Sequence, residues 1–178
     1  MENIKFEIDG NTVQAPAGTT LLQAAKSAGI KIPTLCQNDG LEPYGACRMC
    51  MVEIQKQGRG KLVASCLYQV EEGLSVKTNT EKVQKIRKLL IELLWPAFQQ
   101  YGTEYGVTHS RFHTGMTDCS LCGLCVRYCS EVKKANVLYF KGRGIDRKPA
   151  LIEDAPLSCT GCRECYNLCT SGWVVNRC

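Results

Sequence analysis

The sequence predicts an α+β protein in which two small cysteine-rich modules are joined by a helix. Twelve of the thirteen cysteines fall into three groups of four, within residues 36–66 and 119–169. Apolar residues alternate as in strands near the start of the chain and repeat at helical spacing in its middle. We therefore expect a first module at residues 1–78, a helical linker at 79–115 and a C-terminal module at 116–178.

The first module begins with a strand pattern. Ile4, Phe6 and Ile8 alternate with polar residues, which is typical of a half-buried strand. Asp-Gly-Asn at 9–11 is a turn signal, and residues 12–15 return as a second strand. Two further strands are predicted at residues 51–54 and 61–66, joined by a turn at 57–60.

A short helix is predicted between these two pairs of strands. Thr19 or Thr20 caps it and Gly29 ends it. Two strands, a helix, a cysteine-bearing loop and two further strands are the element order of a β-grasp ferredoxin. The apolar residues of the helix are Leu21, Leu22, Ala25 and Ala28.

The cysteines of the first module are spaced C-x10-C-x2-C-x15-C. Plant-type ferredoxins use C-x4-C-x2-C…C, so this chain keeps the close pair and lengthens the first gap. Gly45 and Ala46 are small enough to let backbone amides approach a cluster. A zinc site is the less favoured alternative, because zinc ribbons usually carry two close pairs. The four cysteines are Cys36, Cys47, Cys50 and Cys66.

The C-terminal module contains the run C-x2-C-x2-C-x3-C twice, which is the bacterial ferredoxin pattern. Two copies predict two [4Fe–4S] clusters, and the fourth cysteine of each run reaches the other cluster. Ser130 and Thr170 replace the usual proline after each run, and Cys178 is expected to be a spare thiol. The predicted ligand sets are Cys119, Cys122, Cys125 and Cys169 for one cluster, and Cys129, Cys159, Cys162 and Cys165 for the other.

The linker contains an amphipathic helix, predicted over residues 80–95 and ended by Pro96. We expect it to pack the modules together, with a contact to another subunit as the alternative. In the C-terminal module, residues 136–140 and 149–153 are predicted strands, turned at 141–144. The predicted apolar stripe of the linker helix is Val83, Ile86, Leu90, Leu93 and Leu94.

Several runs resemble the large iron–sulfur subunit of respiratory complex I. These are Ile-Pro-Thr-Leu-Cys at 32–36 and Gly-Ala-Cys-Arg-Met-Cys-Met-Val-Glu at 45–53, with weaker matches at 105–112 and 142–146. The same module opens related subunits of NAD-linked hydrogenases and formate dehydrogenases. The resemblance implies that Cys36, Cys47, Cys50 and Cys66 hold a [2Fe–2S] cluster.

The linker departs from the family pattern. In the family, the helix leads to His-Pro and then to cysteines that hold a His-ligated [4Fe–4S] cluster. This chain has Trp95-Pro96 and no cysteine within residues 67–118, so it is expected to lack that cluster. His109 and His113 are the only histidines, and both are expected to be ordinary polar loop residues.

No catalytic constellation is recognisable in the sequence. The glycines at 58–60 and 142–144 do not complete a dinucleotide-binding motif, and there is no Walker A string. The chain ends at residue 178, where family members often continue into a catalytic domain. We therefore expect a non-catalytic electron-transfer subunit of a hetero-oligomer. Its expected partners are a flavoprotein subunit that binds NAD(H) or NADP(H) and a second redox subunit.

Composition favours metal-binding cysteines over disulfides. The cysteine count is odd, the first residues contain no export signal, and no apolar run is long enough to span a membrane. A cytoplasmic location is expected. The formal charge of +5 partly compensates cluster charge, and is weak support for nucleic-acid binding. The parent complex could be of hydrogenase, formate dehydrogenase or transhydrogenase type, with electron bifurcation left open. A free polyferredoxin and a zinc-stapled binding module remain alternatives.

Overall fold

The structure is a computed structural model that describes residues 3–56, 58–95, 97–112, 119–153, 162–172 and 174. Several residues named above lie outside these ranges, so the structure does not bear on the predictions made for them. They are Gln57, Pro96, His113, Cys159 and Cys178.

The first module is built on a five-stranded sheet with the order β2-β1-β5-β3-β4. The hairpins β1–β2 and β3–β4 are antiparallel, whereas β5 lies between them, parallel to β1 and antiparallel to β3. β5 was not predicted from the sequence, because it has only three residues. The strands are β1 (Asn3–Ile8), β2 (Asn11–Pro16), β3 (Met51–Lys56), β4 (Arg59–Ala64) and β5 (Ser75–Lys77).

The predicted helix forms as α1 (Leu21–Ser27). Thr20 is its N-cap: the Thr20 side chain accepts the Gln23 amide, and the Gln23 side chain accepts the Thr20 amide. This reciprocal capping satisfies backbone donors that the first turn leaves free. One buried face of the sheet packs on α1, with Phe6 and Ile8 at the centre of the core, so the alternation in β1 is confirmed.

The linker holds α2 (Glu81–Leu93) and α3 (Gln99–Tyr105). The predicted amphipathic helix is confirmed, but its buried face differs from the predicted stripe. Arg87 and Ile91 are buried beside Val83, whereas Leu93 is 51% exposed. The reason is that the Arg87 guanidinium finds buried carbonyl partners, which a hydrophobic pattern cannot show.

The C-terminal module has a two-stranded antiparallel sheet, in which Leu138 pairs with Leu151. The two predicted strands therefore form, with bounds shifted by one or two residues. Its other elements are short turns of helix, as expected for segments that follow closely spaced cysteines. The elements are α4 (Leu124–Arg127), the π-helical turn η1 (Tyr128–Val132), β6 (Leu138–Lys141), the 3-10 turn η2 (Gly144–Asp146), β7 (Lys148–Leu151) and the 3-10 turn η3 (Glu164–Leu168).

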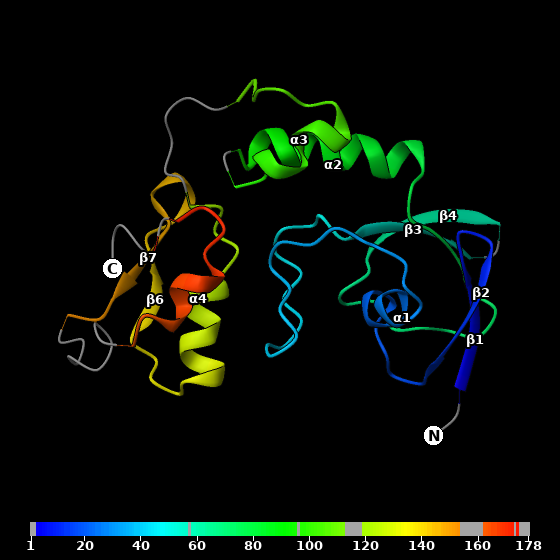
Figure 1. Cartoon of the computed structure of the whole chain (residues 1–178), viewed down its shortest axis with the longest axis horizontal. Coiled ribbons are helices and arrows are strands. Elements are labelled where there is room, and N and C mark those ends of the chain that lie inside the picture. Colours follow the sequence, from blue (N-terminus) through cyan, green and yellow to red (C-terminus); the bar gives the residue numbers. More distant parts are fainter. Residues whose placement is uncertain are drawn as a thin grey trace.

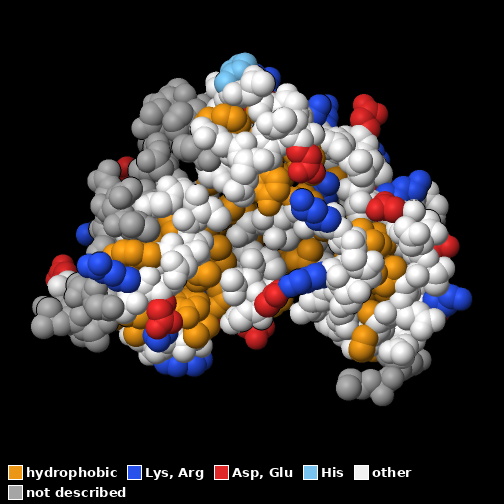
Figure 2. All heavy atoms as spheres, in the orientation of Figure 1, with side chains coloured by type: hydrophobic (Ala, Val, Ile, Leu, Met, Phe, Trp, Pro, Cys, Tyr) orange, Lys and Arg blue, Asp and Glu red, His pale blue; other side chains and the backbone are white. Residues whose placement is uncertain are grey.

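The two modules lie side by side beneath the linker helices (Figure 1). The α2 helix contacts β3 of the first module and α3 of the linker. Figure 2 shows hydrophobic side chains on the flank of the C-terminal module that faces the hollow between the modules, while charged side chains are spread along the rim. None of the helices in the described ranges has the length and apolar character needed to cross a bilayer.

Candidate functional site

The four cysteines of the first module are all buried. Cys36, Cys47 and Cys50 lie in the loop between α1 and β3, and Cys66 follows β4. The Cys50 and Cys66 sulfurs are 3.4 Å apart. The Cys47 amide donates to the Cys36 sulfur, also at 3.4 Å. The structure therefore brings together four thiols from a loop and a strand end, arranged as two close pairs.

The electrostatics of these pairs suit a metal-bound thiolate site. Hydrogen bonding with Cys47 lowers the pKa of Cys36 to about 6, and hydrogen bonding with Cys66 lowers the pKa of Cys50 to about 6. The same hydrogen bonds, with burial, raise the pKa of Cys47 and of Cys66. Without a cation, each pair thus favours one thiolate and one thiol. Metal ions remove the remaining proton from a coordinating thiol.

Gly45 shapes the loop beside these cysteines. Its φ of 67° lies in the left-handed region, where a side chain is disfavoured. A Cβ at this position would lie 2.4 Å from Cδ1 of Leu67, the residue after Cys66. The absence of a side chain at Gly45 therefore lets the Cys66 segment close against the loop. A small residue was predicted here so that backbone amides could approach a cluster. In the structure the close neighbour of Gly45 is the Leu67 side chain.

One pocket of the C-terminal module is lined by four cysteines from two separate runs. Burial raises the pKa of Cys119, of Cys122 and, to about 12, of Cys125. Cys129, the fourth member of the first run, does not line this pocket. The lining cysteines are Cys119, Cys122, Cys125 and Cys169, the set that the crossed pattern predicts for one [4Fe–4S] cluster.

Three of the four ligands predicted for the other cluster lie in the described ranges. Cys129 is buried in the core of the module, and Cys165 packs against that core. Cys162 is half-buried, and its thiol donates to Glu164, which helps to lower the pKa of Glu164 after the larger effects of Lys133 and Tyr128. No group of three or more His, Cys, Asp or Glu side chains in the described ranges is arranged to hold a single metal ion.

A salt-bridged contact joins the two runs of the C-terminal module. Glu164 of η3 accepts the Tyr128 hydroxyl at 2.7 Å and pairs with Lys133 at 2.6 Å. Both partners follow the first three cysteines of the first run, whereas Glu164 lies within the second run. The two halves are therefore held together as the crossed ligand pattern requires.

Arg87 of α2 holds the loop of the first module from the linker side. Its guanidinium donates to the carbonyls of Met49 and Met51, at 3.2 and 3.0 Å, and to the Tyr105 hydroxyl at 3.3 Å. Met49 lies between Cys47 and Cys50, so α2 supports the backbone that carries two predicted ligands. This role of Arg87 was not predicted, because helical periodicity does not reveal a buried arginine.

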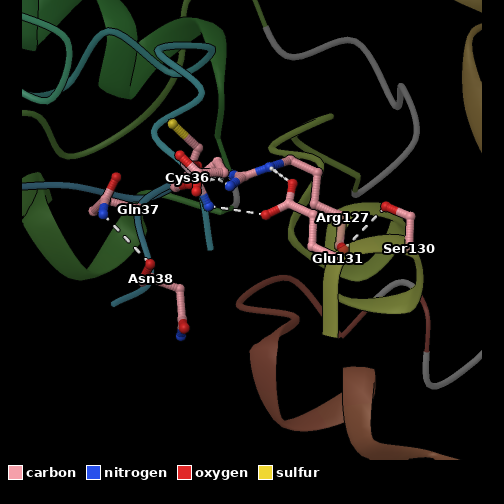
Figure 3. A network of polar contacts seen from close by, with 7 residues as sticks. Cys36, Gln37, Asn38, Arg127, Ser130 and Glu131 are labelled. Carbon is pink, nitrogen blue, oxygen red and sulfur yellow. Dashed lines mark hydrogen bonds and ion pairs between the residues drawn. The ribbon is translucent and has the colours of Figure 1, made fainter. Parts of the chain in front are cut away.

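Arg127 makes the corresponding contact between the two cysteine-rich modules. It lies in α4, and its guanidinium reaches the Cys36 carbonyl at 3.1 Å (Figure 3). Cys122 packs against the core cluster that contains Cys36, Cys47 and Met49. Two of the predicted cluster sites are therefore neighbours. A charged residue inside a cysteine run was the only sequence signal for this contact.

His109 is an exposed residue that contacts Thr108, with 3.1 Å between the Thr108 hydroxyl and Nδ1 of His109. This environment suits the polar loop residue that was predicted. Trp95, which stands at the family's histidine position, packs beside the Phe98 and Tyr105 core. The family's ligand position is thus used here for packing.

Comparison with known proteins supports the same interpretation. Residues 1–81 match the family model of the 2Fe-2S iron-sulfur cluster binding domain. The chain is 27% identical, over 99% of its length, to the mitochondrial NADH-ubiquinone oxidoreductase 78 kDa subunit of Candida albicans. It is 30% identical, over 97% of its length, to an NADH-quinone oxidoreductase subunit of Rhizobium meliloti. These alignments cover 29% and 24% of the two relatives, so the chain spans about a quarter of their length.

A solved structure shows the same similarity in three dimensions. A chain of an NAD+-reducing [NiFe]-hydrogenase in the H2-reduced state superposes with a TM-score of 0.76 and 27% identity. The match covers 86% of this chain and 77% of the hydrogenase chain. The fold and the matched domain define an iron–sulfur protein with a 2Fe–2S domain at residues 1–81. The chain is therefore similar, over most of its length, to subunits of NADH-linked oxidoreductases and to a chain of an NAD+-reducing hydrogenase, which confirms the resemblance predicted from the sequence.

Proposed function

We propose that this chain is an electron-transfer subunit with three cluster sites in series. The pocket lined by Cys119, Cys122, Cys125 and Cys169 carries the proposal. It gathers ligands from both ferredoxin-type runs and leaves out Cys129, as crossed ligation requires. The convergence of one buried and three half-buried cysteines from two separate runs on one pocket supports a shared metal centre.

The residue assignment follows the three quartets. A β-grasp first module at residues 1–78 holds one [2Fe–2S] cluster, and the C-terminal module at 116–178 holds two [4Fe–4S] clusters as a bacterial-type ferredoxin. The linker at 79–115 positions the modules and holds no His-ligated cluster. When bound, such clusters accept and release single electrons, while the protein orients them and excludes water. The ligands are Cys36, Cys47, Cys50 and Cys66; Cys119, Cys122, Cys125 and Cys169; and Cys129, Cys159, Cys162 and Cys165.

The partners lie on other polypeptides. Relatives are named as subunits of NADH oxidoreductases, and the chain itself contains no recognisable substrate site. We infer a hetero-oligomer with a flavoprotein that handles NAD(H) or NADP(H) and a second redox subunit, located in the cytoplasm. The complex is of the hydrogenase, formate dehydrogenase or transhydrogenase type. Whether it bifurcates electrons depends on the partner subunits.

The decisive experiment is an anaerobic preparation of the native chain. Brown protein with about ten iron atoms per chain, two plus four plus four, is expected. Reduction should give paramagnetic signals of both cluster types. Zinc in place of iron, in colourless protein, would overturn the proposal in favour of a zinc-stapled module.

Purification from the native host separates a subunit from a free polyferredoxin. Co-purification with a flavin-containing chain is expected for a subunit. A stable monomer that holds iron and carries no partner would support the polyferredoxin alternative instead.

A further inference from the structure

Arg127 is a buried arginine that joins two modules far apart in sequence. It lies two residues after Cys125 and two before Cys129. Its Nη1 donates to the Cys36 carbonyl at 3.1 Å, and its Nη2 donates to the Glu42 carbonyl. Both acceptors belong to the first module, in the segment 36–44 that begins at a predicted [2Fe–2S] ligand (Figure 3).

Glu131 completes the contact from the next turn of helix. One of its carboxylate oxygens accepts Nε of Arg127 at 3.0 Å, and the other accepts the Glu42 amide at 2.8 Å. Both backbone groups of Glu42 are therefore held by the C-terminal module. The Arg127 guanidinium also lies 5.0 Å from the centre of the Tyr44 ring.

The chemistry of this contact requires arginine. All three guanidinium nitrogens are used, and they serve one carboxylate and two carbonyls in different directions. A lysine ammonium cannot reproduce this planar fork. The Arg127 side chain is 9% exposed and that of Glu131 is 30% exposed, so the pair is only partly buried. A pair of this kind contributes little to stability by itself, and we therefore look to the geometry that it fixes.

The contact lies where two predicted cluster sites approach each other. Cys122 packs against the core cluster that includes Cys36 and Cys47. Movement of segment 36–44 away from α4 would therefore separate the first quartet from the pocket of Cys119, Cys122, Cys125 and Cys169.

We infer that Arg127 and Glu131 are positioning residues that fix the separation of the [2Fe–2S] site from the neighbouring [4Fe–4S] site, and thereby control electron exchange between them. The inference rests on the proposed function. The exchange moves one electron from the reduced site to the oxidised site, breaks no bond and requires no proton. The rate of electron transfer through protein falls steeply with the distance between two sites. A loosened segment 36–44 should therefore slow the exchange.

The test compares Arg127→Gln and Arg127→Lys with Arg111→Gln in the cluster-loaded chain. Arg111 is a matched control: it pairs with Glu92 at 2.7 Å and lies over the Phe112 ring at 5.2 Å, but its side chain is 65% exposed and neither of these two partners is a predicted ligand. Three quantities are measured beside iron content. They are hydrogen exchange in segment 36–44, the dipolar splitting between reduced clusters in paramagnetic resonance, and the rate of electron exchange after rapid reduction.

We expect Arg127→Gln to retain iron, to lose protection of the Glu42 amide and to reduce the dipolar splitting. Electron exchange should slow several-fold, since its rate falls steeply as the two sites move apart. Arg127→Lys should lie between this variant and the parent, and Arg111→Gln should match the parent.

Unchanged splitting and exchange rate in iron-replete Arg127→Gln would overturn the inference and leave the proposed function intact. If Arg127→Gln does not retain iron, the same measurements are made on Glu131→Gln, because this variant keeps the guanidinium and removes only its charged partner. Parental splitting in that variant also overturns the inference. Absence of iron in the parent chain refutes the proposed function itself.

Discussion

The two cysteine-rich modules differ in what holds them together. The first module has a five-stranded sheet, and its core draws on every strand and on α1. Within its described residues the C-terminal module pairs two four-residue strands, and two of its buried core residues are themselves predicted ligands. Because the described part of the C-terminal module buries few apolar side chains, we expect the proposed clusters to stabilise it, whereas the first module should persist without metal. The core of the C-terminal module within the described ranges is Cys125, Cys129, Val137, Leu138 and Val174.

Removal of iron should give the largest difference in stability between the two modules. In the full-length chain treated anaerobically with a chelator, the β6 and β7 amides should lose their protection from hydrogen exchange. The β1 and β3 amides should keep theirs, because their core contains apolar side chains from all five strands. Equal loss of protection in both modules would contradict the difference drawn here.

Substitution of single predicted ligands should also affect the C-terminal module more than the first module, with smaller effects than complete removal of iron. Cys47→Ser should lower the iron content from about ten to about eight per chain, and Cys169→Ser to about six or fewer. Only Cys169→Ser should also expose the C-terminal module to proteolysis. Cys178→Ser, outside every motif, is the control and should keep full iron. Unchanged iron in Cys169→Ser would refute the crossed ligand assignment.

Arg87→Met tests how strongly the linker supports the first module. The change leaves the Met49 and Met51 carbonyls without their buried donor, which should cost about 1–3 kcal/mol in the free energy of unfolding. Arg111→Met, at an exposed position, should change it by less than about 0.5 kcal/mol. Urea denaturation of both variants measures the difference, and equal effects would remove the special role of Arg87.

Gly45→Ala tests the close approach beside Cys66, with Gly73→Ala as its matched control. Both glycines have φ near +70°, at 67° and 69°, but a Cβ at Gly73 meets nothing within 4 Å. The left-handed conformation should cost each variant roughly 1 kcal/mol in unfolding free energy. Only Gly45→Ala should displace Leu67 and alter the spectrum of the [2Fe–2S] site. A shared spectral change would show that backbone strain, and not contact, is responsible.

The smallest effect is expected for Glu71 on the first module. Its hydrogen bonds from Lys56 and Tyr68 lower its pKa below the ordinary value. A lowered folded-state pKa adds stability above the unfolded pKa, and that stability is lost as pH falls through the folded value. The side chain is 43% exposed, so Glu71→Gln should cost less than about 1 kcal/mol at neutral pH. The parent should lose this advantage below about pH 4, and urea denaturation of both proteins across this range measures it.

The regular part of the fold was predictable because local patterns decide it. Alternation in β1, the Thr20 cap of α1 and the periodicity of α2 are all visible in sequence. β5 was missed because three residues give too little pattern, although the strand holds the centre of the sheet. Its position depends on pairing with distant strands.

The candidate ligands could be predicted from cysteine spacing, but the residues that hold the ligand-bearing segments in place could not. Close cysteine runs name candidate ligands directly. Arg87 and Arg127 are buried by partners found only in the folded chain, namely backbone carbonyls and one carboxylate. Hydrophobic periodicity places charged residues outside by default, so it assigned Leu93 inward and overlooked Arg87.

The central place of β5 has a consequence for biosynthesis. In the hydrogen-bonded sheet the two hairpins of the first module are joined through β5, which is the last of these five strands to be synthesised. On the ribosome, therefore, the sheet cannot close before residue 77 has left the exit tunnel. Until then, Cys66 and the loop that carries Cys36, Cys47 and Cys50 belong to a half that is still unjoined to the first hairpin. Until β5 has paired, these thiols are therefore expected to remain accessible to solvent.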